Sequence, residues 1–235
     1  MTAPAAVVAA LAPTGVLRAV INLGNAVLAQ GTPDAPSGVT VALARELAAR
    51  LDVDADLTCT DAARDSFAAV RDGRVDVGFL AAEPQRAEHV AFTDPYVLIE
   101  GVYAVPASSS LRTADDVDAP GVRIGVKEGS AYDLALTRTL QHAQIVRGAE
   151  GTAVLEAGAA DVAAGIRQPL TRWADARDVR VLEPRFTEIR QAVATGRDRA
   201  PAAVDWLRGQ VADLVGSGFV ADALAASGQD ATVAS

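Results

Sequence analysis

Residues 53–80 read VDADLTCTDAARDSFAAVRDGRVDVGFL, and this stretch decides the fold. The alternating segment 53–58 predicts a strand, 62–71 predicts a helix, and the apolar run 75–80 predicts a second strand. Consecutive strands joined by a helix need a crossover connection, so we expect the two strands to lie parallel in one sheet with the helix on its face.

The same alternation continues toward the N-terminus. Residues 17–22 are apolar and lie between glycines, which predicts a strand. In 39–51, Val39, Leu43, Leu47 and Leu51 recur every fourth residue, which predicts a helix with one buried face. The loop 24–38 between them contains prolines and glycines typical of turns.

A second series of elements follows residue 120. We expect strands at 122–126, 144–146, 161–164 and 179–182, and helices at 130–140, 152–157 and 168–176. From Arg190 onward the chain starts extended and then becomes amphipathic helix. The fold class is therefore α/β, with mostly parallel sheets and flanking helices.

The two series share a short internal repeat. Gly73-Arg-Val-Asp76-Val77 leads through an apolar strand to Glu83-Pro84, and Gly158-Ala-Ala-Asp161-Val162 leads through another to Gln168-Pro169. In both copies we expect the proline to be the first residue of a helix, where its missing N–H does no harm. The two aspartates, just before buried strands, are expected to cap neighbouring backbone.

Length and charge limit the function. The chain of 235 residues is long enough for two lobes of roughly 100 residues each. Its formal net charge is −9 and it has no basic run, which argues against a nucleic-acid partner. The single Cys59 excludes an internal disulfide, and we interpret it as a strand residue rather than a reactive thiol.

Hydrophobic runs bear on location. No apolar run reaches the roughly 18 residues of a membrane span, so we expect no membrane insertion. The apolar segment 5–12 has no preceding Lys or Arg and is interpreted as a short helix, not a signal peptide. As written, the sequence predicts a cytoplasmic protein; it predicts a periplasmic or extracellular one if a leader has been removed.

Residues 70–105 resemble the extracellular solute-binding proteins of family 3, the amino-acid-type substrate-binding proteins of ABC transporters. The matching elements are Val70-Arg-Asp-Gly73-Arg-Val-Asp76-Val77, then Arg86, then Phe92-Thr-Asp-Pro95-Tyr96. The segments 38–48, 124–132 and 215–219 are also similar to family motifs, in the same order. The resemblance extends from about Leu17 to Leu224.

The resemblance implies a two-lobed class II periplasmic-binding fold. Lobe one would comprise residues 1–104 and 192–235, and lobe two residues 105–191. Two hinge crossings would let the lobes close over a small ligand. Membrane subunits of an ABC transporter would be the protein partner.

In lobe one the resemblance implies a carboxylate site around Arg86, at the start of the helix that Pro84 opens. A guanidinium fork beside free helix N–H groups suits a carboxylate. The alternative is a surface arginine paired with Glu83 or Glu88. We also assign Leu80, Ala81 and Asn25 to the site, although an asparagine in a glycine-rich loop is as often part of a turn.

In lobe two the ligand candidates follow two strands. Ser130 is a good helix N-cap, and Gly129 before it lets the backbone approach an anion; capping without a ligand is the alternative. Lys127 either lines the site or points to solvent. Arg167 and Gln168 complete the set.

Two departures from the family pattern concern the ligand. Ala81 stands where family members have threonine, and Ile166 stands where they have the aspartate that pairs with the ligand's ammonium. Arg167 would repel an ammonium. A second anionic group of the ligand, or a neutral polar one meeting Gln168, fits these residues better. We therefore expect a small organic acid, or a ligand with an uncharged nitrogen, in preference to an ordinary α-amino acid. The alternative is that Glu83 or Glu100 binds the ammonium.

Other classes of function remain open from the residues alone. An enzyme similar to cyclohexadienyl dehydratases would need a buried general acid, and Glu83, Glu100 and Glu128 each lack a second catalytic group spaced with them. An interaction protein with a vestigial cleft is a third possibility. His89 and His142 have no metal-ligand spacing, so we expect neither metal nor cofactor.

Overall fold

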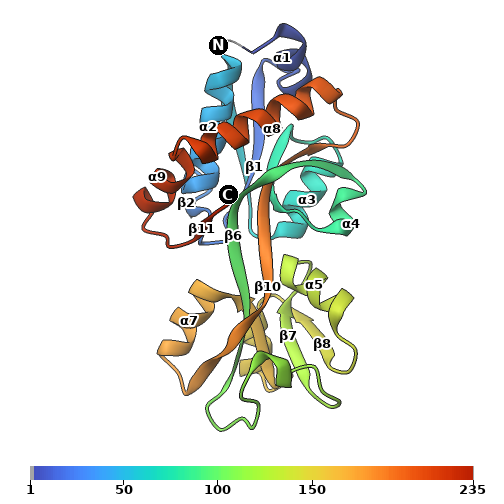
Figure 1. Cartoon of the computed structure of the whole chain (residues 1–235), viewed down its shortest axis with the longest axis vertical. Helices are drawn as coiled ribbons and strands as arrows, with labels where there is room; N and C mark the ends of the chain where they lie inside the picture. Colours follow the sequence, from blue (N-terminus) through green and yellow to red (C-terminus); the bar gives the residue numbers. More distant parts are fainter. Residues whose placement is uncertain (1–2, 235) are drawn as a thin grey trace. The chain divides into compact units, whose positions relative to one another are not determined.

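The computed structural model describes residues 3–234, and the chain divides into two compact units. Unit 1 combines Met1–Leu98 with Arg190–Ser235, and unit 2 is Ile99–Ile189. The chain passes between the units inside two long strands, β6 (Val90–Pro106) and β10 (Val179–Gly196), which can be followed in Figure 1.

The lobe boundaries expected from the sequence lie in these same two strands. They were placed after residues 104 and 191, whereas the units are divided after Leu98 and Ile189. Since β6 and β10 are continuous across both positions, the change of unit occurs in extended chain and not in a loop.

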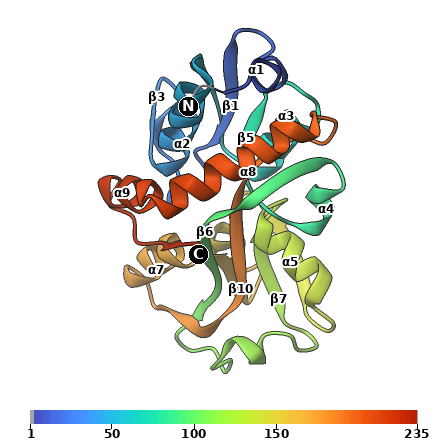
Figure 2. The same ribbon diagram turned by 45° about the horizontal axis from the view of Figure 1, so that its top comes forward.

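Unit 1 is built on three parallel strands. β1 (Val16–Asn22) lies between β4 (Asp54–Thr60) and β5 (Val77–Ala81), and β10 pairs antiparallel with β5. The other elements of this unit are α1 (Ala5–Leu11), the hairpin β2 (Gln30–Thr32) and β3 (Ala35–Ser37), α2 (Val39–Leu51), α3 (Ala63–Arg71), α4 (Pro84–Ala87), α8 (Pro201–Gly216), α9 (Phe219–Ala226) and β11 (Thr232–Val233). Figure 2 shows α8 running across this unit into α9.

Unit 2 repeats the plan with three parallel strands. β7 (Arg123–Lys127) lies between β8 (Gln144–Gly148) and β9 (Val162–Ile166), and β6 pairs antiparallel with β9. The remaining elements are the short η1 (Ala114–Asp116) and the helices α5 (Ala131–Thr139), α6 (Gly151–Glu156) and α7 (Arg167–Asp175). The α/β fold with mostly parallel strands is confirmed.

Helix α2 has the predicted bounds. Its residues Val39, Leu43, Leu47 and Leu51 are buried on one face, as the four-residue period requires. The helix ends at Asp52, which adopts the left-handed conformation of a C-cap.

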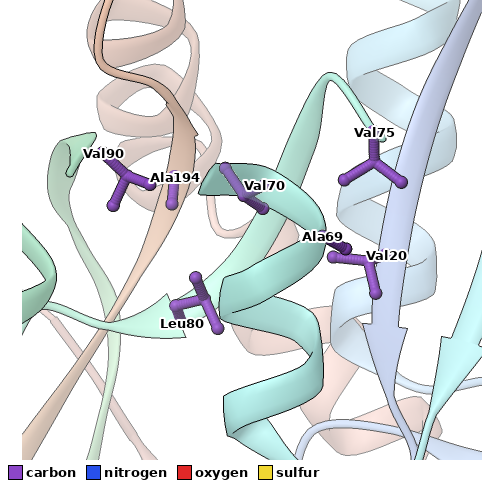
Figure 3. Packing of buried hydrophobic residues seen from close by; sticks show 7 residues of the cluster. All are labelled: Val20, Ala69, Val70, Val75, Leu80, Val90 and Ala194. Carbon is purple, nitrogen blue, oxygen red and sulfur yellow. The ribbon is translucent and has the colours of Figure 1, made fainter. Parts of the chain in front are cut away.

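The hydrophobic core of unit 1 gathers around α3. Figure 3 shows Ala69 and Val70 of this helix between Val20 of β1 and Leu80 of β5. The cluster is completed by Val75, Val90 and Ala194. Full burial of one such Val or Leu side chain contributes about 1.5–3 kcal/mol, so this cluster holds α3 on the sheet.

The expected capping role of Asp76 and Asp161 is confirmed, and the two make the same contacts. The Asp76 carboxylate accepts the backbone N–H of Arg18 at 3.1 Å and its guanidinium at 2.9 and 2.8 Å. Asp161 accepts the corresponding groups of Arg123 at 3.0, 3.1 and 2.8 Å. In each unit the carboxylate therefore joins the start of one strand to its parallel neighbour.

Two details of the prediction were wrong. Pro84 is the first residue of α4, but α7 starts at Arg167, which makes Pro169 its third residue. Strand β10 joins the expected strand 179–182 to the extended segment expected from Arg190, and the sequence did not predict that the two are continuous. No helix within residues 3–234 is long and apolar enough to cross a membrane.

Candidate functional site

The predicted site residues lie at the carboxyl ends of the parallel strands. In unit 1 these ends are Asn22, Thr60 and Ala81, and in unit 2 they are Lys127, Gly148 and Ile166. Ligands of open α/β sheets bind outside such ends. We call them the carboxyl edge of unit 1 and the carboxyl edge of unit 2.

Arg86 lies in the four-residue helix α4 that follows β5. Arg86 is only 3% exposed, so it is not the surface arginine of the alternative interpretation. Nη1 donates to the carbonyl oxygen of Ala81 at 3.3 Å, and the guanidinium lies 5.9 Å from the ring centre of Phe67. These contacts hold the cation at the end of β5.

Burial also changes the electrostatics of Arg86. Removal from water lowers its pKa to about 10, although the nearby Glu83 acts in the opposite direction. A guanidinium normally stays charged well above this pH. An additional negative charge beside Arg86 would therefore be stabilising.

Leu80 and Ala81 are both buried at the end of β5. The Leu80 side chain belongs to the hydrophobic core of unit 1, and Ala81 pairs with Gln191 of β10. Their side chains are used in packing, which leaves only backbone for a ligand. Their place in the site stays a prediction.

Asn25 follows β1 and forms a turn. Its Oδ1 accepts the backbone N–H of Val27 at 3.3 Å, and its carbonyl oxygen accepts those of Leu28 and Ala29, each at 3.0 Å. This is the turn geometry that the sequence left open as the alternative. A ligand contact by Asn25 is not required to explain its burial.

The start of α5 contains a residue that the sequence reasoning missed. Ser130 is the N-cap and accepts the backbone N–H of Asp133 at 3.1 Å, while Asp133 accepts the N–H of Gly129 at 2.9 Å. Asp133 also pairs with Arg147 of β8 at 3.0 Å. The spacing Ser-x-x-Asp is a capping-box signal that could have revealed this.

The consequence concerns Gly129. Its left-handed conformation, with φ of +70°, is the one that glycine favours. Its N–H, however, is donated to the protein's own carboxylate. The hydroxyl of Ser130 is likewise engaged in capping, so both residues have an internal role before any ligand is considered.

Lys127 and Arg167 are both paired with acids of unit 2. Lys127 Nζ lies 2.6 Å from Glu150 Oε1, at the start of α6. Arg167 bonds Glu100 through Nε and Glu183 through both terminal nitrogens. Gln168 follows Arg167 in α7, and its ligand role stays a prediction.

The argument that Arg167 repels a ligand ammonium is wrong. Because Arg167 is bound to two carboxylates, it does not act as an isolated positive charge at the carboxyl edge of unit 2. Ile166 still offers no carboxylate at the end of β9. The missing aspartate alone remains as evidence against an ammonium ligand.

Cys59 and the possible metal ligands give no further candidate for the functional site. Burial, with Asp61 and Asp34 nearby, raises the pKa of the Cys59 thiol on β4, which lowers its reactivity. Among residues 3–234 no group of three or more His, Cys, Asp or Glu side chains could hold a metal ion.

Solved structures share this fold over most of its length. The solute receptor for L-cysteine of Neisseria gonorrhoeae has a TM-score of 0.77 at 21% identity, covering 94% of this chain and 92% of its own. The amino acid ABC transporter substrate-binding protein AbpA of Streptococcus pneumoniae, bound to L-arginine, has a TM-score of 0.75 at 19% identity. The match covers 93% of this chain and 96% of AbpA. The ancestral amino acid-binding protein AncCDT-1, a precursor of cyclohexadienyl dehydratase, has a TM-score of 0.73 at 20% identity. The match covers 89% of this chain and 93% of AncCDT-1.

These similarities define the class: a mixed α/β fold of the class II periplasmic-binding type. The sequence profile of the bacterial extracellular solute-binding proteins, family 3, matches residues 28–224. The chain belongs to this family of solute-binding proteins. No curated protein matches it in sequence.

Proposed function

We propose that this chain binds a small carboxylate-bearing solute, an organic acid or an amino-acid derivative, for an amino-acid-type ABC transporter. Membership of the family supports the transport role. The transporter's membrane subunits would be its protein partner.

The observation that carries the proposal is the burial of Arg86 at the carboxyl edge of unit 1. Burial of the cation disfavours its charged form, and its pKa is lowered to about 10 for that reason. A ligand carboxylate bound in a bidentate manner would restore favourable charge and use the planar fork of the guanidinium. Lysine could supply the charge but not the fork.

Isothermal titration calorimetry of Arg86→Lys and Arg86→Ala tests the assignment. The titrants are the common α-amino acids together with their hydroxy-acid and dicarboxylic-acid analogues. Loss of one partner of a buried charge pair typically costs about 2–5 kcal/mol, which is roughly 30- to several-thousand-fold in affinity. Because Arg86 is buried, the alanine variant should also lose stability. If the alanine variant fails to fold, the lysine variant provides the test.

Arg71→Ala is the matched control. The Arg71 guanidinium lies 5.7 Å from the centre of the same Phe67 ring, but it is exposed and bonded to Asp72 at 2.8 Å. We expect this variant to bind as the unmodified protein does. Binding by Arg86→Lys within about threefold of the unmodified protein would remove Arg86 from the ligand site.

A further inference from the structure

Five charged residues surround the start of α7 in unit 2, and we call them the Arg167 cluster: Glu100, Arg167, Glu183, Arg185 and Glu188. Arg167 donates Nε to Glu100 and its two terminal nitrogens to Glu183, one of them at 2.8 Å. Arg185 donates to Glu100 at 2.9 Å and to Glu188 at 3.1 Å. Every nitrogen of the Arg167 guanidinium therefore has a carboxylate acceptor.

The cluster lies at the carboxyl edge of unit 2. Arg167 directly follows the last residue of β9, Ile166, which pairs across the sheet with Gly101 of β6. Glu100 precedes Gly101, so the register brings this acid beside the end of β9. The cluster thus occupies one of the positions where open α/β sheets bind ligands.

The charges of the cluster do not favour a further anion. Hydrogen bonds from Arg167 hold the pKa of Glu183 below its ordinary value, and those from Arg167 and Arg185 do the same for Glu100 despite its partial burial. Three glutamates against two arginines give the cluster a formal net charge of −1. Arg86 of unit 1 differs, since burial lowers its pKa.

We propose that Glu183 and Glu100 are specificity-determining residues, because they occupy Arg167 and so exclude a second anionic group of the ligand from the carboxyl edge of unit 2. The proposal rests on the proposed function and deepens it. A solute with one carboxylate, including a zwitterion, is then accepted, and a dicarboxylate is rejected. This reverses the preference for a second anionic group that the sequence suggested for Arg167.

Glu183→Gln tests the proposal directly. The side chain of Glu183 is 66% exposed, so the substitution removes one charge with little effect on packing, and it weakens two of the three bonds that occupy Arg167. Inorganic sulfate is the probe, titrated at constant ionic strength and followed by NMR chemical shifts. We expect the apparent Kd for sulfate to fall about tenfold, and Arg167→Met in the same chain to abolish the gain.

Glu156→Gln is the matched control. Glu156 is the last residue of α6, its side chain is 49% exposed, and it bonds Arg177 at 2.9 Å. The Glu156→Gln substitution removes one negative charge, as Glu183→Gln does, but away from the carboxyl edge of unit 2. An equal gain of sulfate affinity in this control, or no gain in Glu183→Gln, would overturn the proposal.

The selectivity itself is measured with L-glutamate and L-glutamine, which have similar shapes and differ by one negative charge. Calorimetry should show the ratio of their Kd values shifting about tenfold toward glutamate in Glu183→Gln. A ratio that stays within threefold counts against the proposal. Sulfate bound at Arg167 shifts the amide signals at the start of α7, whereas sulfate bound at Arg86 shifts those of α4, so failure of the proposed function and failure of this inference are distinguishable.

Discussion

Asp76 in unit 1 and Asp161 in unit 2 make the same set of hydrogen bonds in different surroundings. Each donates its own N–H to the carbonyl oxygen of an arginine, at 2.8 and 2.9 Å, and accepts that arginine's N–H and guanidinium. The Asp76 side chain is 0% exposed and also pairs with Arg199, whereas the Asp161 side chain is 44% exposed. Equal geometry thus coexists with unequal burial.

The difference teaches that the same hydrogen bonds link the two strands in both units, but that burial sets how much these bonds contribute to the free energy of unfolding. A buried carboxylate that loses its partners, or a buried guanidinium that loses its carboxylate, has no water to replace them. An exposed pair is replaced by water at small cost. The same motif should therefore be essential in unit 1 and modest in unit 2.

The largest effect is expected for Asp76→Ala. It removes the shared acceptor of Arg18 and Arg199 and leaves the Arg18 backbone N–H without its carboxylate. We expect a loss of about 3–5 kcal/mol in the free energy of unfolding, measured by urea denaturation. A loss below about 1 kcal/mol would show that burial does not amplify this contact.

Acid should remove the same contribution. Burial by itself raises the pKa of Asp76, but the hydrogen bonds from Arg18 and Arg199 outweigh it, and the net pKa lies below its ordinary value. A lowered carboxyl pKa stabilises the fold above the unfolded value of about 3.9 and ceases to do so as the pH falls below it. Denaturation curves at pH 6 and pH 3 should show the gap between the unmodified protein and Asp76→Ala shrinking at the lower pH.

Gly78→Ala tests a second pair of corresponding positions. Gly73 and Gly158, like Asp76 and Asp161, are 85 residues apart, and the same spacing aligns Gly78 with Ala163. A Cβ on Gly78 would lie 2.6 Å from Val70 Cγ2 and 2.9 Å from Val20 Cγ1, both in the core.

We expect Gly78→Ala to lower the free energy of unfolding by about 1–3 kcal/mol through overpacking. Ala163 already packs in the core of unit 2, so Ala163→Gly should cost only about 1 kcal/mol. Gly209→Ala in α8 is the control, because nothing lies within 4 Å of its added Cβ. The stabilities of the three variants are measured by thermal and urea denaturation. An unchanged free energy of unfolding for Gly78→Ala would contradict the packing argument.

The smallest effect is expected for Asp161→Ala. The variant loses the acceptor of the Arg123 N–H and a half-exposed ion pair, for which water substitutes. We expect a loss of about 1 kcal/mol in the free energy of unfolding. A loss as large as that of Asp76→Ala would mean that the hydrogen-bond geometry matters more than burial.

Much of the fold was predictable from local patterns. The bounds of α2 were predicted correctly, because its apolar period is uninterrupted. The length of β6 was not, because Asp94-Pro95 interrupts the pattern that a strand should show. β11 pairs with β6 at Val97 and Leu98, just after this interruption, and a partner strand more than 130 residues away leaves no local signal.

The candidate site was predictable in position but less so in chemistry. Arg86, Ser130 and Arg167 all follow the strands that the sequence indicated. The Ser-x-x-Asp spacing at the start of α5, where Asp133 accepts the N–H of Gly129, was readable from the sequence but was missed. The carboxylates bound to Arg167 come from residues 16 and 67 positions away, and no local pattern links them.

The sequence by itself determined the order of strands and helices and the strand ends that carry polar side chains. These follow from periodicity and turn chemistry, which act between near neighbours in the chain. Only the tertiary structure decided that Arg86 is buried, that Arg167 is neutralised and that Asp76 is shielded where Asp161 is not. Desolvation and Coulomb interactions depend on distance in space and on access to water, and residues far apart in the chain set both.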